Sequence, residues 1–392
     1  MIFVKILKYP EGKIMLTVFK NGFVYNTGKR IFEKKDLYVR DGLICEKGDA
    51  DCSIDCTGRY IIPGLVDVHT HGRSGYDFNT ADEQGVRRMR EEYAKIGTTT
   101  VMATLASATM ESFEESIAAI NKNRTAENGC ANIAGIHLEG RYLNPKKRGA
   151  HAENLLAPLD ADEAGELIKK MMPLPVHVSA ALEEDGAEDF TKTLIGMGAT
   201  VALAHSDATY DEAMKAVEWG ATAFTHTFNA MRAMHHREPG CAVASMLADG
   251  AYTELICDGE HVNPAMIKLC DRAKADGKTV LITDSMEATG CPDGEYSIAG
   301  MPVFVKNGKA VTSDGALAGS TLDLWTGLMN FMAFTGKTLE DALPCATINP
   351  ANEVGIGGIC GSIEIGKRAD FIILNEKNDP EIESVYVNGE KI

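Results

Sequence analysis

Four histidines and two acidic residues have the types and positions needed to bind a divalent metal ion. They are His69, His71, Glu139, His205, His226 and Asp284. His69 and His71 are two residues apart, so on a strand both imidazoles point to the same face. Imidazole and carboxylate ligands suit zinc, iron or another first-row divalent ion. Such an ion activates water near neutral pH and polarises a carbonyl group, which is the chemistry that hydrolysis of an amide needs.

All six residues stand at the ends of apolar runs that alternate with amphipathic segments of helix length. The runs cover residues 65–71, 98–104, 133–138, 174–179, 200–205, 221–226, 252–257 and 280–284. The segments between them include 83–96, 110–123, 185–197, 210–219 and 264–275. This alternation predicts an α/β chain with a closed, parallel (β/α)8 TIM-like barrel, whose active site forms at the C-terminal ends of the strands. We therefore expect the six side chains to meet at one mouth of the barrel.

Both ends of the chain have the pattern of short strands instead. Residues 15–26 have the character of a hairpin around Asn21-Gly22, and Asp41-Gly42 is a second turn. Residues 295–313 resemble an inserted hairpin, and helices are expected near 322–334 and 339–348. We predict a metal-dependent barrel domain over residues 64–354, and a small β-sandwich domain formed by residues 1–63 and 355–392.

The amino-acid composition indicates which kind of partner the protein binds and in which compartment it lies. The net charge of −17 argues against nucleic acid, which needs clustered lysine and arginine. The ten cysteines form no CxxC pair, as expected of reduced thiols in the cytoplasm. Residues 1–10 lack the features of a signal peptide, and no apolar run is long enough to span a membrane. We therefore expect a cytoplasmic protein with a small-molecule substrate and no membrane partner.

Two longer segments carry a family resemblance. The stretch PGLVDVHTHG (63–72) resembles the first-strand motif of the amidohydrolase superfamily, and GSIEIGKRADF (361–371) resembles its return strand. Inner motifs are similar to those of the N-acetylglucosamine-6-phosphate deacetylase family within it. These are HLEGRYLNP (137–145), GAH (149–151), AHSDATYDEA (204–213), HTFNAM (226–231), HHREPG (235–240), CDGEHV (257–262), TDSM (283–286) and LAGSTL (317–322).

The resemblance implies a metal centre that holds one or two divalent ions, most simply zinc or iron. Glu139, His205 and His226 would surround one ion. His69 and His71 would hold the other, with Glu139 as a bridge, since no lysine ends the fourth apolar run. Asp284 is placed to act as general base and then as general acid.

The same resemblance implies a set of substrate contacts and a homodimer. His151 would lie near the scissile group, and the phosphate and sugar would be bound by Asn229, Ala230, Arg237 and His261. His137 should share the face of Glu139, whereas His177 is expected to be a core residue. Arg141-Tyr142 departs from the family's usual proline–aromatic pair, so an altered contact beside the site is expected.

Three alternatives remain open on the sequence alone. The nearest is the same reaction on N-acetylgalactosamine 6-phosphate. A cyclic amidase is a more distant alternative, because it would normally need the bridging lysine that this chain lacks. A binding or scaffold protein on a decayed barrel would have lost ligands, and all the expected ligands are present here.

Overall fold

The chain folds around an eight-stranded parallel sheet. The computed structural model describes residues 15–392; the first 14 residues, which the sequence assigns to the small domain, lie outside the described part. Neighbouring strands pair in chain order, as expected for a barrel of βα units. The strands are β8 (Leu65–Thr70), β11 (Thr98–Ala106), β12 (Asn132–Glu139), β13 (Val176–Ala180), β14 (Thr200–Leu203), β15 (Ala223–Phe224), β16 (Tyr252–Ile256) and β17 (Thr279–Ile282).

The first and last strands of this sheet meet and close it into the predicted TIM-like barrel. The backbone N–H of Asp284 donates to the carbonyl of His69 over 2.9 Å, and Thr70 forms a parallel bridge with Ser285. The Thr283 hydroxyl also donates to the Asp67 carboxylate over 2.6 Å. These bonds fix the segment that carries Asp284 against the strand that leads to His69 and His71.

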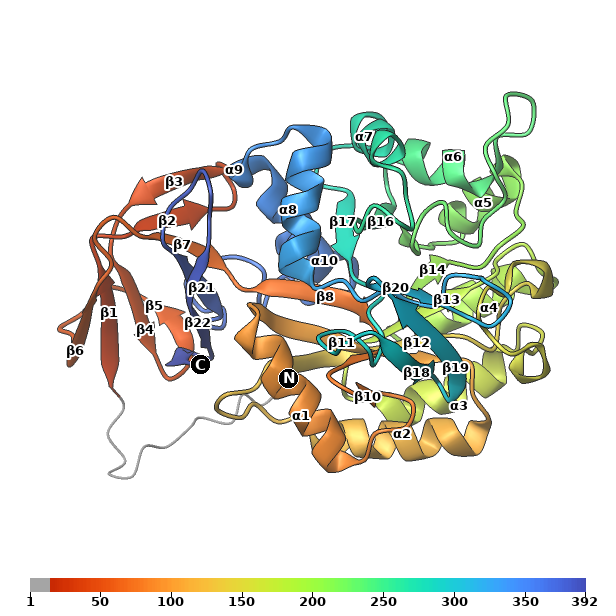
Figure 1. Cartoon of the computed structure of the whole chain (residues 1–392), viewed down its shortest axis with the longest axis horizontal. Coiled ribbons are helices and arrows are strands. Elements are labelled where there is room, and N and C mark those ends of the chain that lie inside the picture. Colours follow the sequence, from red (N-terminus) through yellow and green to blue (C-terminus); the bar gives the residue numbers. More distant parts are fainter. Residues whose placement is uncertain (1–14) are drawn as a thin grey trace.

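Helices cover the outside of the barrel (Figure 1). The seven that lie between barrel strands are α1 (Glu83–Lys95), α2 (Met110–Lys122), α3 (Ala161–Met171), α4 (Ala187–Gly196), α5 (Tyr210–Glu218), α6 (Gly240–Leu247) and α7 (Pro264–Ala273). Side chains cap several N-termini; at α5, Thr209 and Glu212 form a reciprocal capping box. The five expected helices are all present, and α3 and α6 add to them. Two short 3₁₀ turns, η1 (Pro145–Lys147) and η2 (Glu153–Leu155), lie in the loop after β12.

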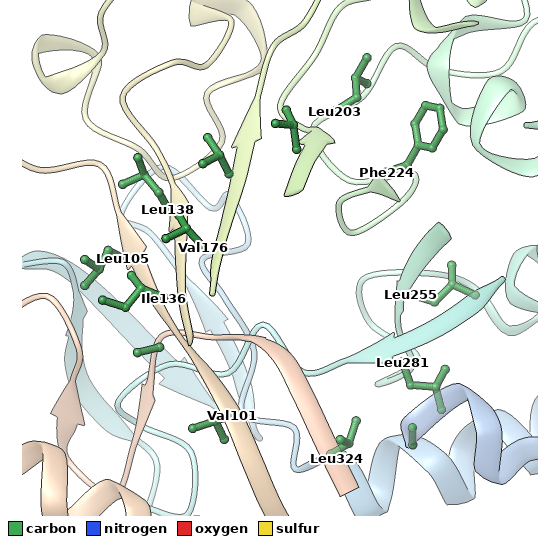
Figure 2. Packing of buried hydrophobic residues seen from close by; sticks show 14 of the residues in the cluster. Val101, Leu105, Ile136, Leu138, Val176, Leu203, Phe224, Leu255, Leu281 and Leu324 are labelled. Atoms are coloured by element: carbon green, nitrogen blue, oxygen red, sulfur yellow. The ribbon is translucent and has the colours of Figure 1, made fainter. Parts of the chain in front are cut away.

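The apolar side chains of strands and helices form one large core. Figure 2 shows Leu105, Leu138, Phe224 and Leu281 among its buried members, and each has at most 1% of its surface exposed. Because these side chains come from strands around the whole sheet, the core holds the strand ends in fixed relative positions. No helix within residues 15–392 is long and apolar enough to cross a bilayer.

Two further sheets come from the chain ends and lie side by side next to the barrel (Figure 1). One has the order β5 (Leu43–Cys45), β4 (Leu37–Arg40), β1 (Leu16–Lys20), β6 (Cys52–Asp55). The other has the order β23 (Glu390–Lys391), β22 (Ile382–Val387), β21 (Phe371–Leu374), β7 (Tyr60–Pro63), β2 (Phe23–Asn26), β3 (Ile31–Lys34). The second sheet joins strands from both ends. The domain bounds given above remain a prediction.

The expected hairpin over residues 15–26 is wrong. β1 pairs with β4 and β6, whereas β2 pairs with β3 and β7, so the two strands belong to different sheets. Asn21 has a φ of 64° and turns the chain from one sheet into the other. The turn at Asp41-Gly42 does join a hairpin, since β4 and β5 are antiparallel neighbours.

The segment after β17 also differs in detail from the expectation. The insertion has three strands, β18 (Gly294–Ile298), β19 (Met301–Lys306) and β20 (Lys309–Val311). The expected helix at 339–348 is broken into α9 (Leu339–Ala342), the 3₁₀ turn η3 (Leu343–Ala346) and α10 (Ile348–Glu353), because Pro344 cannot continue an α-helix. α8 (Leu324–Thr335) precedes them, and the short pair β9 (Gly72–Arg73) and β10 (Tyr76–Asp77) follows β8.

Candidate metal centre

Glu139 lies at the centre of the predicted ligand set. Its Oε2 is 3.2 Å from His69 Nε2 and 3.0 Å from His71 Nε2. Its Oε1 is 3.3 Å from His205 Nε2 and 2.9 Å from His226 Nε2. One carboxylate thus faces two pairs of histidines, one pair with each oxygen. All five side chains are buried.

The arrangement fits metal ions better than a hydrogen-bond network. The Nε2 atoms of His205 and His226 are 3.1 Å apart and face the same carboxylate oxygen. His69 Nε2 is buried without a geometrically sound hydrogen-bond partner. Nitrogen and oxygen atoms that converge in this way are the ligands of a first-row divalent ion. Within residues 15–392, one candidate ion cluster joins His69, His71, Glu139 and Asp284, and another joins Glu139, His151 and His205.

Two of the histidines have their outer nitrogens fixed by neighbours. His205 Nδ1 donates to the carbonyl of Lys147 over 2.8 Å, and His69 Nδ1 lies 3.4 Å from Glu254 Oε2. With the proton on Nδ1 in this assignment, the Nε2 lone pair is free to face an ion. The ring of His137 packs edge-on against the ring of His69 and keeps it in place.

Three site residues lie in turns that follow their strands, not on the strands themselves. β14 ends at Leu203 and β15 at Phe224, two residues before the histidines that the sequence had placed on those strands. His205, His226 and Asp284 have φ values of 43°, 31° and 49°. Non-glycine residues in this left-handed region cost about 1–3 kcal/mol each and concentrate at functional sites. The turns aim these side chains at Glu139.

Asp284 lies beside the first histidine pair. Its Oδ1 is 3.2 Å from His71 Nε2 and 3.5 Å from His69 Nε2. Burial raises the pKa of Asp284, but the facing His69 and His71 imidazoles outweigh it and lower the pKa to about 2. For Glu139, too, the surrounding imidazoles outweigh burial and hold the pKa well below its usual range. Both groups are therefore carboxylates at neutral pH.

His151 reaches the cluster from the loop after β12. Its ring packs edge-on against His205, with ring centres 4.8 Å apart. The backbone N–H of Ser107 donates to His151 Nδ1 over 3.3 Å, so the ring proton is assigned to Nε2. Burial lowers the pKa of His151 to about 3, which keeps the ring neutral. Gly149 lets the loop approach, because an added Cβ would lie 3.2 Å from His205 Cε1.

Ser107 was not singled out in the sequence, and it depends on a close approach by Gly140. A Cβ on Gly140 would lie 2.3 Å from the Ser107 backbone nitrogen. We expect Gly140→Ala to lower stability by about 1–3 kcal/mol, as overpacking does, and to reduce activity by displacing the donor to His151. Thermal unfolding and steady-state kinetics measure both effects. Gly196→Ala is the control, since its Cβ would meet no atom within 4 Å. Unchanged unfolding and activity in Gly140→Ala would contradict this reading.

The residues assigned to the phosphate and sugar are more dispersed. Asn229 donates through Nδ2 to the carbonyl of His226, and Ala230 accepts from the N–H of Ser206. His261 is held by Asp258, with Nδ1 2.6 Å from Oδ2. Arg237 lies in an exposed loop and donates to His236 Nε2. Among the described contacts, none joins His261 or Arg237 to the metal cluster, so their roles stay predictions.

The unusual Arg141-Tyr142 pair has a local explanation. The Arg141 guanidinium forms a two-pronged ion pair with Glu163 on α3, at 2.6 and 2.9 Å. The Tyr142 hydroxyl donates to the same carboxylate over 2.9 Å. The pair therefore binds the loop after β12 to a helix on the outside of the barrel.

The comparisons with known proteins agree with this geometry. Residues 60–392 match the description "Amidohydrolase family". The N-acetylglucosamine-6-phosphate deacetylase of Vibrio furnissii is 36% identical, over 84% of this chain and 82% of its own. The N-acetylgalactosamine-6-phosphate deacetylase of Escherichia coli is 31% identical, over 90% of this chain and 93% of its own.

Solved structures give the same result. The N-acetylglucosamine-6-phosphate deacetylase of Pasteurella multocida superposes with a TM-score of 0.88 at 28% identity, over 96% of this chain and 99% of its own. A mutant enzyme of that name from Mycobacterium smegmatis, in complex with N-acetyl-D-glucosamine-6-phosphate, has a TM-score of 0.86 at 29% identity, over 97% of this chain and 99% of its own. The chain belongs to the amidohydrolase family.

Proposed function

We propose that the protein hydrolyses N-acetyl-D-glucosamine 6-phosphate to D-glucosamine 6-phosphate and acetate. The observation that carries the proposal is the position of Glu139, whose two oxygens each face a histidine pair at one mouth of a barrel. Relatives that bear the deacetylase name cover most of the chain. The reaction belongs to amino-sugar breakdown and recycling, and we assign it to the cytoplasm.

The cofactor of this reaction would be one or two divalent ions, zinc or iron. Glu139 with His205 and His226 would hold one of them, and His69 with His71 the other. When bound, such an ion supplies an activated water near neutral pH and polarises the amide carbonyl. Glu139 keeps the two histidine pairs at a common point. The Lys147 carbonyl and Glu254 orient two of the rings, as outer partners of metal ligands commonly do.

Asp284 and His151 supply the proton transfers and the hydrogen bond that the chemistry needs. Asp284 is ionised and borders the ligand cluster, so it can accept the proton of the attacking water. It then returns that proton to the nitrogen as the C–N bond breaks, because an amine leaves far more readily when protonated. His151, neutral with its proton on Nε2, donates to the developing oxyanion.

The substrate phosphate and sugar are assigned to Asn229, Ala230, Arg237 and His261. Backbone amides and a guanidinium suit a phosphate, and Asp258 fixes His261 so that its Nε2 faces outward from the pair. The Arg237 side chain is exposed and has no acidic partner among the described contacts. We also propose a homodimer in which a neighbouring subunit completes the phosphate site.

Arg237→Ala should weaken binding of the phosphorylated substrate far more than that of the unphosphorylated sugar. A charge-assisted bond to a phosphate contributes about 1.5–3 kcal/mol, so kcat/KM should fall roughly ten- to a hundredfold with the phosphorylated sugar alone. Lys146→Ala, which removes an exposed charge from another loop, is the control. An equal fall in kcat/KM with both sugars would contradict the assignment of Arg237 to the phosphate site.

A second candidate is the same reaction on N-acetyl-D-galactosamine 6-phosphate, which the Escherichia coli relative favours. Steady-state assays of amine release with both 6-phosphorylated N-acetylhexosamines, each with zinc and with iron, decide between them. We expect the higher kcat/KM with the gluco isomer. A higher value with the galacto isomer would reverse the assignment, and no amine release from either would overturn the proposed function.

A further inference from the structure

A second group of buried side chains lies inside the barrel, behind the catalytic cluster. It comprises His177 on β13, Glu254 on β16 and Glu353 at the end of α10. In the pairing of β12 with β13, His177 lies opposite His137, two residues before the level of Glu139. At most 1% of the surface of each of the three residues is exposed. One ligand atom from each lies within 4.8 Å of the other two.

The atoms that face one another in this group are acceptors, and within residues 15–392 they meet no backbone N–H or hydroxyl donor. Glu254 Oε1, both oxygens of Glu353 and His177 Nε2 are buried, and a hydrogen bond between the two acids needs one of them to be protonated. His177 Nε2 and Glu254 Oε1 are 3.9 Å apart. Leaving several polar atoms of two carboxyl groups unpaired in an apolar interior is strongly unfavourable. These acceptor atoms therefore need a proton or a cation between them.

A hydrogen bond at Nδ1 holds the His177 ring with its Nε2 toward the group. His177 Nδ1 is 2.8 Å from Thr200 Oγ1, and in the tautomer in which Nδ1 donates to that oxygen, Nε2 carries the lone pair. Burial also lowers the pKa of His177 to about 4, so the ring is neutral at pH 7.

Glu254 is anchored so that only one of its oxygens faces the group. Its Oε2 accepts from the backbone N–H of His226 over 3.2 Å and lies 3.4 Å from His69 Nδ1. Its Oε1 is therefore turned away from the catalytic histidines. Glu353 faces it from α10, which is fixed to the barrel because the Asn349 side chain donates to the carbonyl of Thr279 over 2.8 Å.

We propose that His177, Glu254 and Glu353 bind a divalent metal ion of the zinc, iron or manganese class, at a site separate from the catalytic cluster. Imidazole nitrogens and carboxylate oxygens are ligands of these ions. His177 Nε2 and Glu254 Oε1 are 3.9 Å apart, which is slightly more than the roughly 3.3–3.6 Å between two ligands of a tetrahedral ion with bonds of about 2.0–2.2 Å. A small shift of either side chain would let both reach one ion. The ion would hold α10 to β13 and β16, and would stiffen Glu254 behind His69.

A proton is the simplest competing occupant. Burial and the facing Glu254 carboxylate raise the pKa of Glu353 well above its usual range, so a shared proton could join the two acids. A proton shared by the two acids would still leave His177 Nε2 buried without a partner. A metal ion would bind all three side chains, which is why we favour it.

The direct test is a crystal of the full-length wild-type protein loaded with zinc chloride, with diffraction data collected on both sides of the zinc absorption edge. We expect an anomalous peak between His177, Glu254 and Glu353, in addition to the density at the catalytic cluster. A map without a peak at this place overturns the proposal, whatever the catalytic cluster contains. Density for a water molecule alone would do the same.

Metal content in solution gives an independent measurement. Elemental analysis of the dialysed, zinc-loaded protein should show one ion fewer per chain in Glu353→Gln than in the wild type. Glu383→Gln, which alters an exposed ion pair with Arg59, should not change the count. Glu139→Gln should lose at least one catalytic ion and keep the anomalous peak at this site, so the map together with the activity assay distinguishes failure of the proposed function from failure of this site. An unchanged count in folded Glu353→Gln contradicts the site; if that variant does not fold, the anomalous map decides.

Discussion

Asp284→Asn is expected to abolish measurable turnover while the metal ions stay bound. The amide retains an oxygen beside His71 but can neither accept the proton of water nor return it to the amine. Loss of a general acid–base of this kind lowers kcat by roughly a hundred- to ten-thousandfold. Because the same group serves two proton transfers here, we expect the upper end of that range. Steady-state kinetics and elemental analysis on the same preparation measure both parts of the prediction.

The control for Asp284→Asn is an acid that has no part in the site. Asp276 is exposed and pairs with Arg30 at 2.8 Å, so Asp276→Asn should retain full activity. A fully active Asp284→Asn would refute the acid–base assignment. An inactive Asp284→Asn that has also lost its ions would instead make Asp284 chiefly a ligand, which its distance of 3.2 Å from His71 Nε2 also permits.

The barrel could be predicted from the sequence because its signals are local. Each strand is a nearly continuous apolar run, and five of the eight (β8, β12, β14, β15 and β17) end at or close to a residue of the predicted site. The pairing of β1 and β2 could not be predicted in the same way. An Asn-Gly turn favours a hairpin, but β1 finds its partners at β4 and β6, and these long-range pairings decide the sheet.

Most of the metal centre could also be predicted from the sequence, since the side chains of all six predicted residues converge. The residues that support these six could not be predicted. Ser107 contributes a backbone N–H, which has no sequence signal, and Lys147 contributes a carbonyl oxygen. Glu254 did leave a trace, because an acid inside the apolar run 252–257 is unusual for a strand buried on both faces. Its proposed role depends on Glu353, which lies about a hundred positions further along the chain, so the sequence around Glu254 does not predict it.

Glu139→Gln tests the geometry on which the proposed chemistry depends. Glutamine has the shape of glutamate, but one of its two terminal atoms is an NH₂ group that donates and cannot bind a cation. Since each oxygen of Glu139 faces its own histidine pair, the substitution must place that NH₂ toward one of the pairs. It also removes the negative charge that offsets the charge of the ions. We expect loss of at least one catalytic ion per chain and a fall in kcat of roughly a hundred- to a thousandfold, the range found when a single electrostatic contribution to catalysis is removed.

The measurement for Glu139→Gln is metal content alongside activity, with Glu163→Gln as the matched control. Glu163 is also partly buried and hydrogen-bonded, but it lies on α3 on the outside of the barrel, and its partners are Arg141 and Tyr142 in the loop after β12. Its loss should lower stability and leave the ions in place. If Glu139→Gln kept all its ions and its activity, the carboxylate could not be the bridge between the histidine pairs. The four histidines would then have to hold the ions without it, although their Nε2 atoms converge on its oxygens.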